Sequence, residues 1–105
     1  MSDYKDDLLE DLKDPSYATH YLSAAYADSP EAFLIALRDV ADAQMGMKRL
    51  AVEAGVNREN LYRMLSEDGN PRLNSLRAVL NALEVKVEFK SRLSEGKKAP
   101  AALPG

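Results

Sequence analysis

The stretch "MKRLAVEAGVNRENLYRML", residues 47–65, places one glycine between two short segments of helical composition. Gly55 can adopt the left-handed backbone conformation that often ends a helix, which residues with a Cβ adopt only at a cost. Ala51, four residues earlier, is small enough to let two helices cross closely. The pattern therefore predicts helices over 47–54 and 58–66, joined by a fixed turn, with Asn57 placed to cap the second helix.

The polar residues of this stretch indicate a function for the fixed turn. Its apolar positions can lock the second helix across the first, which leaves the polar side chains outside. A helix held in this way can lie in the DNA major groove and present side chains near its N-terminus to base edges. The residues predicted to contact bases or backbone are Asn57, Arg58, Glu59, Tyr62 and Arg63, with Ser66 beside them. Those predicted to contact phosphates are Lys48, Arg49 and Arg72.

Helix starts are also marked upstream of this stretch. Asp14–Pro15 and Ser29–Pro30 each combine a capping side chain with a proline, whose missing N–H costs nothing at the first helical position. They predict helices over 15–27 and from residue 30 to about residue 44. Leucines spaced by three and four predict another helix over 73–83.

The C-terminal part changes pattern. "VKVEF", residues 85–89, alternates apolar and charged side chains, which is the period of a half-buried strand. Residues 91–105 are rich in small residues, Lys, Gly and Pro, and are predicted to be a disordered tail. We therefore divide the chain into an acidic extension with the first helix (1–28), a helix-turn-helix domain (29–90) and this tail.

Composition narrows the class of protein. The 105 residues have no cysteine, which excludes disulfides and thiolate metal sites, and the length suits one domain. No apolar run approaches the ~20 residues that span a bilayer, and the acidic N-terminus is unlike a signal peptide. We expect a cytoplasmic protein with no membrane contact.

Charge is segregated along the chain. Residues 1–46 hold three Lys/Arg against ten Asp/Glu, giving −7, and residues 47–105 hold eleven against seven, giving +4, so that the whole carries −3. The acidic end would repel DNA, so we expect it to meet a different, basic partner. A short amphipathic stretch there either packs on the domain or grips that partner. Its predicted contact residues are Asp6, Asp7, Leu8, Leu9, Glu10, Asp11 and Leu12.

Two longer segments carry a family resemblance. "LAVEAGVNRENLYRML" with "GNPRLNSLRAVLNALEVKV" resembles the Xre/Cro/cI-type helix-turn-helix proteins. The upstream "YLSAAYAD" and "EAFLIALRDVADA" resemble the addiction-module antidote subfamily, and the likeness covers about residues 8–89. One departure is Arg72, which stands where members often have a capping Ser or Thr.

The resemblance implies an all-α, five-helix, lambda-repressor-like domain, here with a short C-terminal strand. It also implies a bacterial antitoxin that neutralises a small RelE/ParE-like toxin and represses its own promoter. We expect a homodimer on double-stranded operator DNA, because such proteins read two half-sites. The alternatives are a stand-alone or phage-type transcriptional regulator without a toxin, and a protein-interaction adaptor.

Nothing in the sequence predicts catalysis, a metal site or a cofactor. His20 is the only histidine and has no ligand partner at metal-binding spacing. Asp39 and Asp42 are three residues apart, and this spacing is common among surface carboxylates on helices. We therefore expect a binding protein and not an enzyme.

Overall fold

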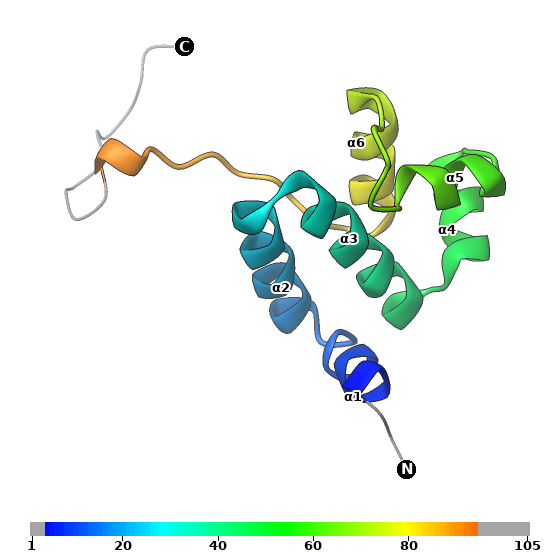
Figure 1. Cartoon of the computed structure of the whole chain (residues 1–105), viewed down its shortest axis with the longest axis horizontal. Helices are drawn as coiled ribbons and strands as arrows, with labels where there is room; N and C mark the ends of the chain where they lie inside the picture. Colours follow the sequence, from blue (N-terminus) through cyan, green and yellow to red (C-terminus); the bar gives the residue numbers. More distant parts are fainter. Residues whose placement is uncertain (1–3, 95–105) are drawn as a thin grey trace.

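The computed structural model describes residues 4–94, which form six α-helices and one short 3-10 helix (Figure 1). In chain order these are α1 (Tyr4–Asp11), α2 (Pro15–Asp28), α3 (Pro30–Gln44), α4 (Met47–Ala54), α5 (Arg58–Met64), α6 (Leu73–Ala82) and η1 (Arg92–Ser94). α1, α2 and α4 all pack on α3. Figure 1 shows α3 between α2 on one side and the group of α4, α5 and α6 on the other.

The predicted all-α class is correct. The predicted number of five helices and the predicted C-terminal strand are wrong. The sixth helix is α1, formed by the acidic amphipathic stretch that we had not counted as a helix. Residues 85–89 form neither helix nor strand, and within residues 4–94 no segment forms a strand. A strand requires neighbouring backbone groups to complete its ladder, and alternation of side chains alone does not supply them. Val87 and Phe89 are 58% and 97% exposed.

The predicted helix starts of α2 and α3 are confirmed. Asp14 accepts a hydrogen bond from the Ser16 N–H at 3.3 Å, and the Ser29 hydroxyl accepts one from the Ala32 N–H at 3.0 Å. Each cap is followed by a proline in the first turn. The chemistry of a few adjacent residues therefore fixes where both helices begin.

One hydrophobic core joins the acidic and the basic parts of the chain. Leu12 from the N-terminal side and Leu37, Leu50 and Leu61 from the later helices all have 0% exposure and belong to the same cluster. The division of the chain into three parts stays a prediction. Of the predicted disordered tail, residues 95–105 lie outside the described residues.

Long-range polar contacts fasten α1 to α3. The Gln44 side-chain amide donates to the Leu12 carbonyl at 3.1 Å, and the Lys5 ammonium lies 3.6 Å from an oxygen of Asp39. Leu8, on α1, packs against the core as well. The amphipathic stretch therefore packs on the domain, which was one of its two predicted roles.

Tyr21 ties α2 to the same carboxylate. Its hydroxyl donates to Asp39 at 2.8 Å, and Asp39 is only 8% exposed. Burial, together with the hydrogen bond to Asp39 and the charge of that carboxylate, raises the pKa of Tyr21 well above its usual range. Asp39 is thus a buried carboxylate with partners from both α1 and α2.

We predict that Tyr21→Phe lowers the free energy of unfolding by about 1–2 kcal/mol at pH 7, because Asp39 loses a donor where water has little access. The folded pKa of Tyr21 lies above the unfolded value of about 10. The contribution of this hydroxyl is therefore complete below about pH 10 and declines as pH rises further.

Urea unfolding at pH 7 and at about pH 10.5 would measure both effects. Tyr17→Phe is the matched control, because Tyr17 is 44% exposed and lies on the same helix. Equal unfolding free energies for the two variants at pH 7 would show that the Tyr21–Asp39 hydrogen bond contributes no net stability.

Candidate functional site

The turn between α4 and α5 has the conformation that the sequence predicts. Gly55 is left-handed, with φ 70° and ψ 33°, and its N–H reaches back to the carbonyls of Ala51 and Val52. The next N–H, from Val56, donates to the Ala51 carbonyl at 3.0 Å. These bonds close α4 and turn the chain so that α5 lies across its end (Figure 1).

Both ends of α5 are fixed. At its start, the Asn57 side-chain oxygen accepts from the N–H groups of Glu59 and Asn60 at 2.8 and 3.2 Å, as predicted. Past its end, a Cβ at Gly69 would collide with the Met64 carbonyl, so only glycine allows this close approach. Leu61, fully buried, anchors the middle. The outer face of α5 is therefore presented on a rigid support.

The structure brings some of the predicted DNA-contacting residues together. Asn57, Arg63 and Arg72 line one open groove of about 430 Å³ that runs between α5 and the loop before α6. Arg58 and Glu59 are exposed on the first turn of α5, whereas Lys48 and Arg49 are exposed on α4, away from this groove. Ser66 is half-buried, and its hydroxyl donates to the Arg63 carbonyl at 2.8 Å.

Several of these side chains already have partners. Arg63 donates to the Asn60 side-chain oxygen at 3.2 Å, and Arg49 lies 3.4 Å from a Glu53 oxygen. Arg72 precedes α6 without making a side-chain cap, as its chemistry predicts. Exposed pairs of this kind are weak, so a phosphate or a base edge can replace the partner.

Sequence reasoning missed Arg38. Its guanidinium lies 4.7 Å from the ring centre of Tyr62, and its Nε lies 4.0 Å from an Asp42 oxygen. Tyr62, 37% exposed, is thereby held toward α3, while Arg38 supplies a positive charge next to α5. No local signal pointed to this contact, because 24 residues separate the two side chains and Arg38 lies in the acidic half.

The predicted partner-contact residues on the N-terminal stretch divide into two groups. The carboxylates of Asp6, Asp7, Glu10 and Asp11 are exposed. Leu8 and Leu9 are half-buried, and Leu12 is fully buried in the core of its own chain. In this conformation the side chain of Leu12 therefore serves the fold and is not accessible to a partner.

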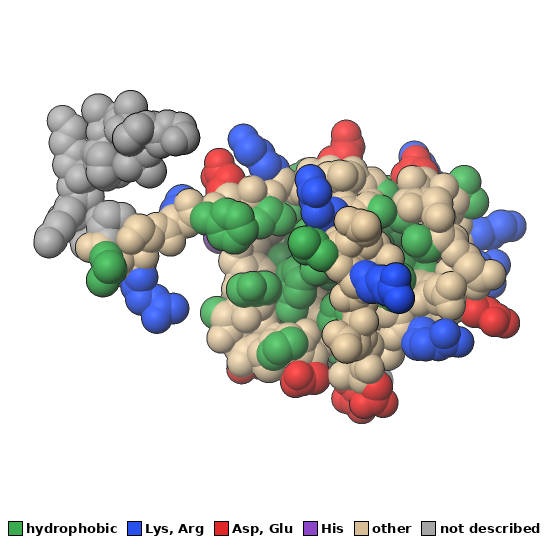
Figure 2. All heavy atoms as spheres, turned by 90° about the horizontal axis from the view of Figure 1, so that it is seen from above, with side chains coloured by type: hydrophobic (Ala, Val, Ile, Leu, Met, Phe, Trp, Pro, Cys, Tyr) green, Lys and Arg blue, Asp and Glu red, His purple; other side chains and the backbone are tan. Residues whose placement is uncertain are grey.

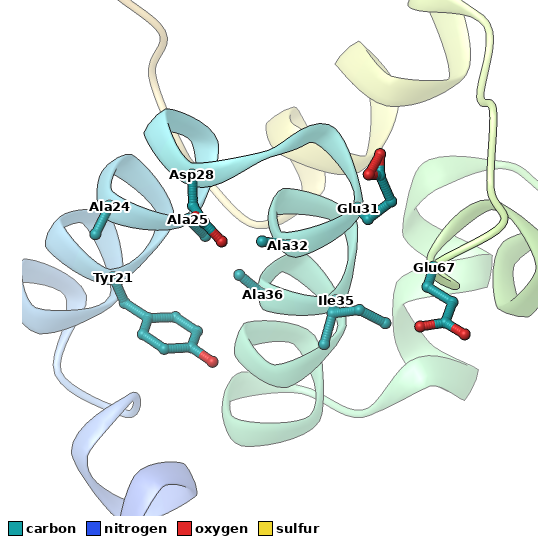
Figure 3. Close-up of a pocket in the computed structure, with 9 residues that line it drawn as sticks. All are labelled: Tyr21, Ala24, Ala25, Asp28, Glu31, Ala32, Ile35, Ala36 and Glu67. Carbon is teal, nitrogen blue, oxygen red and sulfur yellow. The ribbon is translucent and has the colours of Figure 1, made fainter.

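A second hollow lies between α2 and α3 (Figure 3). It has a volume of about 480 Å³, and we call it the acid-rimmed groove because three carboxylates stand among its apolar lining. Figure 3 shows Glu67, from the loop after α5, facing α3 across one side of this space. The lining residues are Tyr21, Ala24, Ala25, Asp28, Glu31, Ala32, Ile35, Ala36 and Glu67.

The two hollows differ in chemistry, since one carries arginines and amides and the other carries carboxylates and methyl groups. Across residues 4–94 no group of His, Asp and Glu side chains is arranged to hold a metal ion. None of the helices in this part of the chain is long and apolar enough to cross a membrane.

Comparison with known proteins assigns the family. A model of the family described as "Probable addiction module antidote protein" matches residues 3–91. The chain belongs to this family. Membership indicates the antitoxin of a toxin–antitoxin module and implies a toxin as partner. The predicted antidote resemblance is confirmed, whereas the Xre/Cro/cI helix-turn-helix assignment stays a prediction.

A relative in Haemophilus influenzae (strain ATCC 51907 / DSM 11121 / KW20 / Rd) is 34% identical over 91 residues. The match covers 77% of this antidote chain and 93% of the relative, which is described as an uncharacterized protein. No solved structure matches the chain.

We predict that Asn57→Ala lowers the free energy of unfolding by about 1 kcal/mol, because two N–H groups at the start of α5 lose their acceptor. Asn60→Ala is the control, since Asn60 is exposed on the same helix and only accepts from Arg63. Urea unfolding followed by circular dichroism would compare them. If both variants unfold at the same urea concentration, the Asn57 cap does not hold α5.

Proposed function

We propose that this antidote is a DNA-binding autorepressor that also neutralises a small basic toxin of the RelE/ParE class in the bacterial cytoplasm. The observation that carries the DNA-binding half is α5, held rigid at both ends, with Arg58 and Arg63 exposed on it. A short helix on a fixed support can enter the major groove without losing further conformational freedom.

The positions of the side chains on and near α5 suggest which part of the DNA each would contact. Arg58 and Arg63 suit base edges, because a guanidinium can donate two hydrogen bonds to guanine. Glu59 can accept from cytosine, whereas the Asn57 oxygen is occupied by the helix cap and leaves only the amide donors. Lys48, Arg49 and Arg72 flank α5 and suit phosphates, which fix register without reading sequence.

Repression requires a stable complex on the promoter. One helix of seven residues reaches few base pairs, so we propose a homodimer that places two copies of α5 on successive half-sites. The antidote family favours this function over a stand-alone regulator or an adaptor, because an antitoxin is encoded to act with a toxin.

The toxin contact is proposed on α1. Its exposed carboxylates and the half-buried Leu9 lie on a helix that is separate from α5, so both contacts can form at once. A basic toxin would be attracted by these charges, and its association rate would fall as salt rises. Deleting residues 1–28 would remove Leu12, Ala18 and Leu22 from the core, so surface substitutions are the appropriate test.

We predict that Arg63→Ala weakens binding to the DNA upstream of the antidote's own gene by about 1–3 kcal/mol, because a base contact is lost. Lys48→Ala should weaken binding to all sequences similarly and lower the salt slope by about one. Fluorescence anisotropy over a salt series, with the upstream duplex and a scrambled duplex, would separate the two effects.

Arg77→Ala is the control for the loss of one positive charge, since Arg77 is exposed on α6. An Arg58/Tyr62/Arg63 triple-alanine variant that binds the upstream DNA as tightly as the wild type would rule out recognition through α5. The toxin is absent from this assay, so its result is independent of toxin neutralisation.

We predict that neutralising three carboxylates on α1 slows toxin association about tenfold or more at low salt while DNA binding is retained. The substitutions are Asp7→Asn, Glu10→Gln and Asp11→Asn. The matched control neutralises three exposed carboxylates elsewhere, by Glu53→Gln, Asp68→Asn and Glu84→Gln. Surface plasmon resonance with the toxin encoded by the adjacent gene would measure the rates. Equal rates for both triple variants would place the toxin contact outside α1.

A further inference from the structure

The segment after α6 exposes apolar side chains that nothing in the described part of the chain covers. We call residues 84–93 the C-terminal arm; it begins against the body, where Val85 packs on the core, and its far end runs away from the helices in Figure 1. Phe89 and Leu93 are 97% and 89% exposed, and Val87 is 58% exposed. Apolar and charged residues alternate from Val85 to Lys90, and η1 then adds Arg92 and Leu93 at the end of the arm. Exposed apolar area of this kind favours a contact that removes it from water.

The arm holds three basic and two acidic residues, and it becomes basic toward its end because Glu84 and Glu88 both lie in its first half. Lys86 is 3.8 Å from Glu88, which leaves Lys90 and Arg92 as positive charges toward the end of the arm. In Figure 2 the arm projects from the body, with apolar and basic side chains visible on it. Its surface therefore combines apolar side chains with positive charge.

The acid-rimmed groove has the opposite character. Its apolar lining comes from four alanines, Tyr21 and Ile35, and Ile35 is 40% exposed although it is a large aliphatic side chain. Asp28, Glu31 and Glu67 stand among them. Apolar lining and negative charge are what an apolar and basic segment requires.

We propose that the C-terminal arm of one copy of this chain docks in the acid-rimmed groove of a second copy, and the reverse, so that the dimer forms by reciprocal exchange of arms. Phe89 would enter the alanine-lined hollow, and Lys90 and Arg92 would lie against the carboxylates. The inference rests on the proposed homodimer and specifies how that dimer is built.

Two features favour a second copy as the occupant. Phe89 is almost fully exposed, so the arm does not occupy the groove of its own chain. Each copy offers one arm and one groove, and reciprocal docking about a two-fold axis leaves neither unfilled. The contact closes on itself and stops at two copies.

The position of the groove adds a consequence for DNA binding. Glu67 lies three residues after the end of α5, and Ile35 lies on α3, on which α4 packs. An arm held there would fix the partner's body close to the unit that carries α5. The spacing between the two copies of α5, and therefore between the half-sites, would be set by this contact.

Cross-linking can test which chain supplies the arm, because the chain has no cysteine. Lys90→Cys would be made in one full-length chain and Glu31→Cys in a second chain of different tag length. A short bifunctional thiol cross-linker should join the two chains when they are mixed. Lys90→Cys with Val52→Cys is the control pair, because Val52 is 77% exposed on α4 and does not line the groove. It should give no product.

Sedimentation equilibrium of the full-length protein would measure the dissociation constant of the dimer. Phe89→Ser should raise the dimer dissociation constant by about a hundredfold or more, because two buried phenyl groups are lost per dimer. Val52→Ser, the same kind of loss at an exposed site on α4, should leave it unchanged. Lys90→Glu should also weaken the dimer, and Glu31→Lys in the same chain should restore it.

The outcomes separate this inference from the proposed homodimer. A wild type that is monomeric at all accessible concentrations overturns both. A dimer that is unchanged by Phe89→Ser, with no cross-link from position 90 to position 31, overturns arm exchange and leaves the homodimer standing. If a single chain that carries both Lys90→Cys and Glu31→Cys cross-links only within itself, while the two single-cysteine chains give no joint product, the arm folds back on its own groove. Loss of toxin binding on Glu31→Lys, with an unchanged dimer, would assign the groove to the toxin.

Discussion

The rest of the structure depends on the burial of α3. Leu37, Val40 and Ala41 have 0% exposure, and α1, α2 and α4 all pack on this one helix. α3 is thus enclosed on most of its circumference, as a helix of a larger core would be. The basic half that carries α5 needs no electrostatic attraction to the acidic half, because α4 packs on α3 of that half and both halves share one apolar core.

The parts of this fold that the sequence predicted are those governed by neighbouring residues. Asp14, Ser29 and Asn57 cap helices with their own side chains, and Gly55 turns the chain with its own backbone. The missed contacts join residues far apart in the chain. Lys5 meets Asp39 and Arg38 meets Tyr62, and neither pair leaves a periodic or compositional trace. The strand was wrong for a related reason, since alternation describes one segment and says nothing of a partner for it.

In the candidate site, too, features set by neighbouring residues could be predicted and contacts between distant residues could not. The exposed polar face of α5 could be predicted, because helical periodicity and one buried leucine fix which side faces outward. That Arg72 would join Asn57 and Arg63 along one groove could not, because this depends on how the loop before α6 returns to α5. For Leu12 the sequence alone could not distinguish two roles. A leucine among charged residues can contact a partner or lie in the core, and the packing of the folded chain shows that Leu12 lies in the core.

Asp39 has a consequence for how the two proposed contacts could influence each other. It receives Lys5 from α1 and Tyr21 from α2, and it is adjacent in sequence to Arg38, which lies over Tyr62 of α5. A ligand that displaced α1 would leave a buried carboxylate with one donor fewer, and any shift of α3 that followed would reach α5 through the contact of Arg38 with Tyr62. Binding at the two ends would then be thermodynamically linked. The factor by which one ligand changes affinity for the other must be the same in both directions.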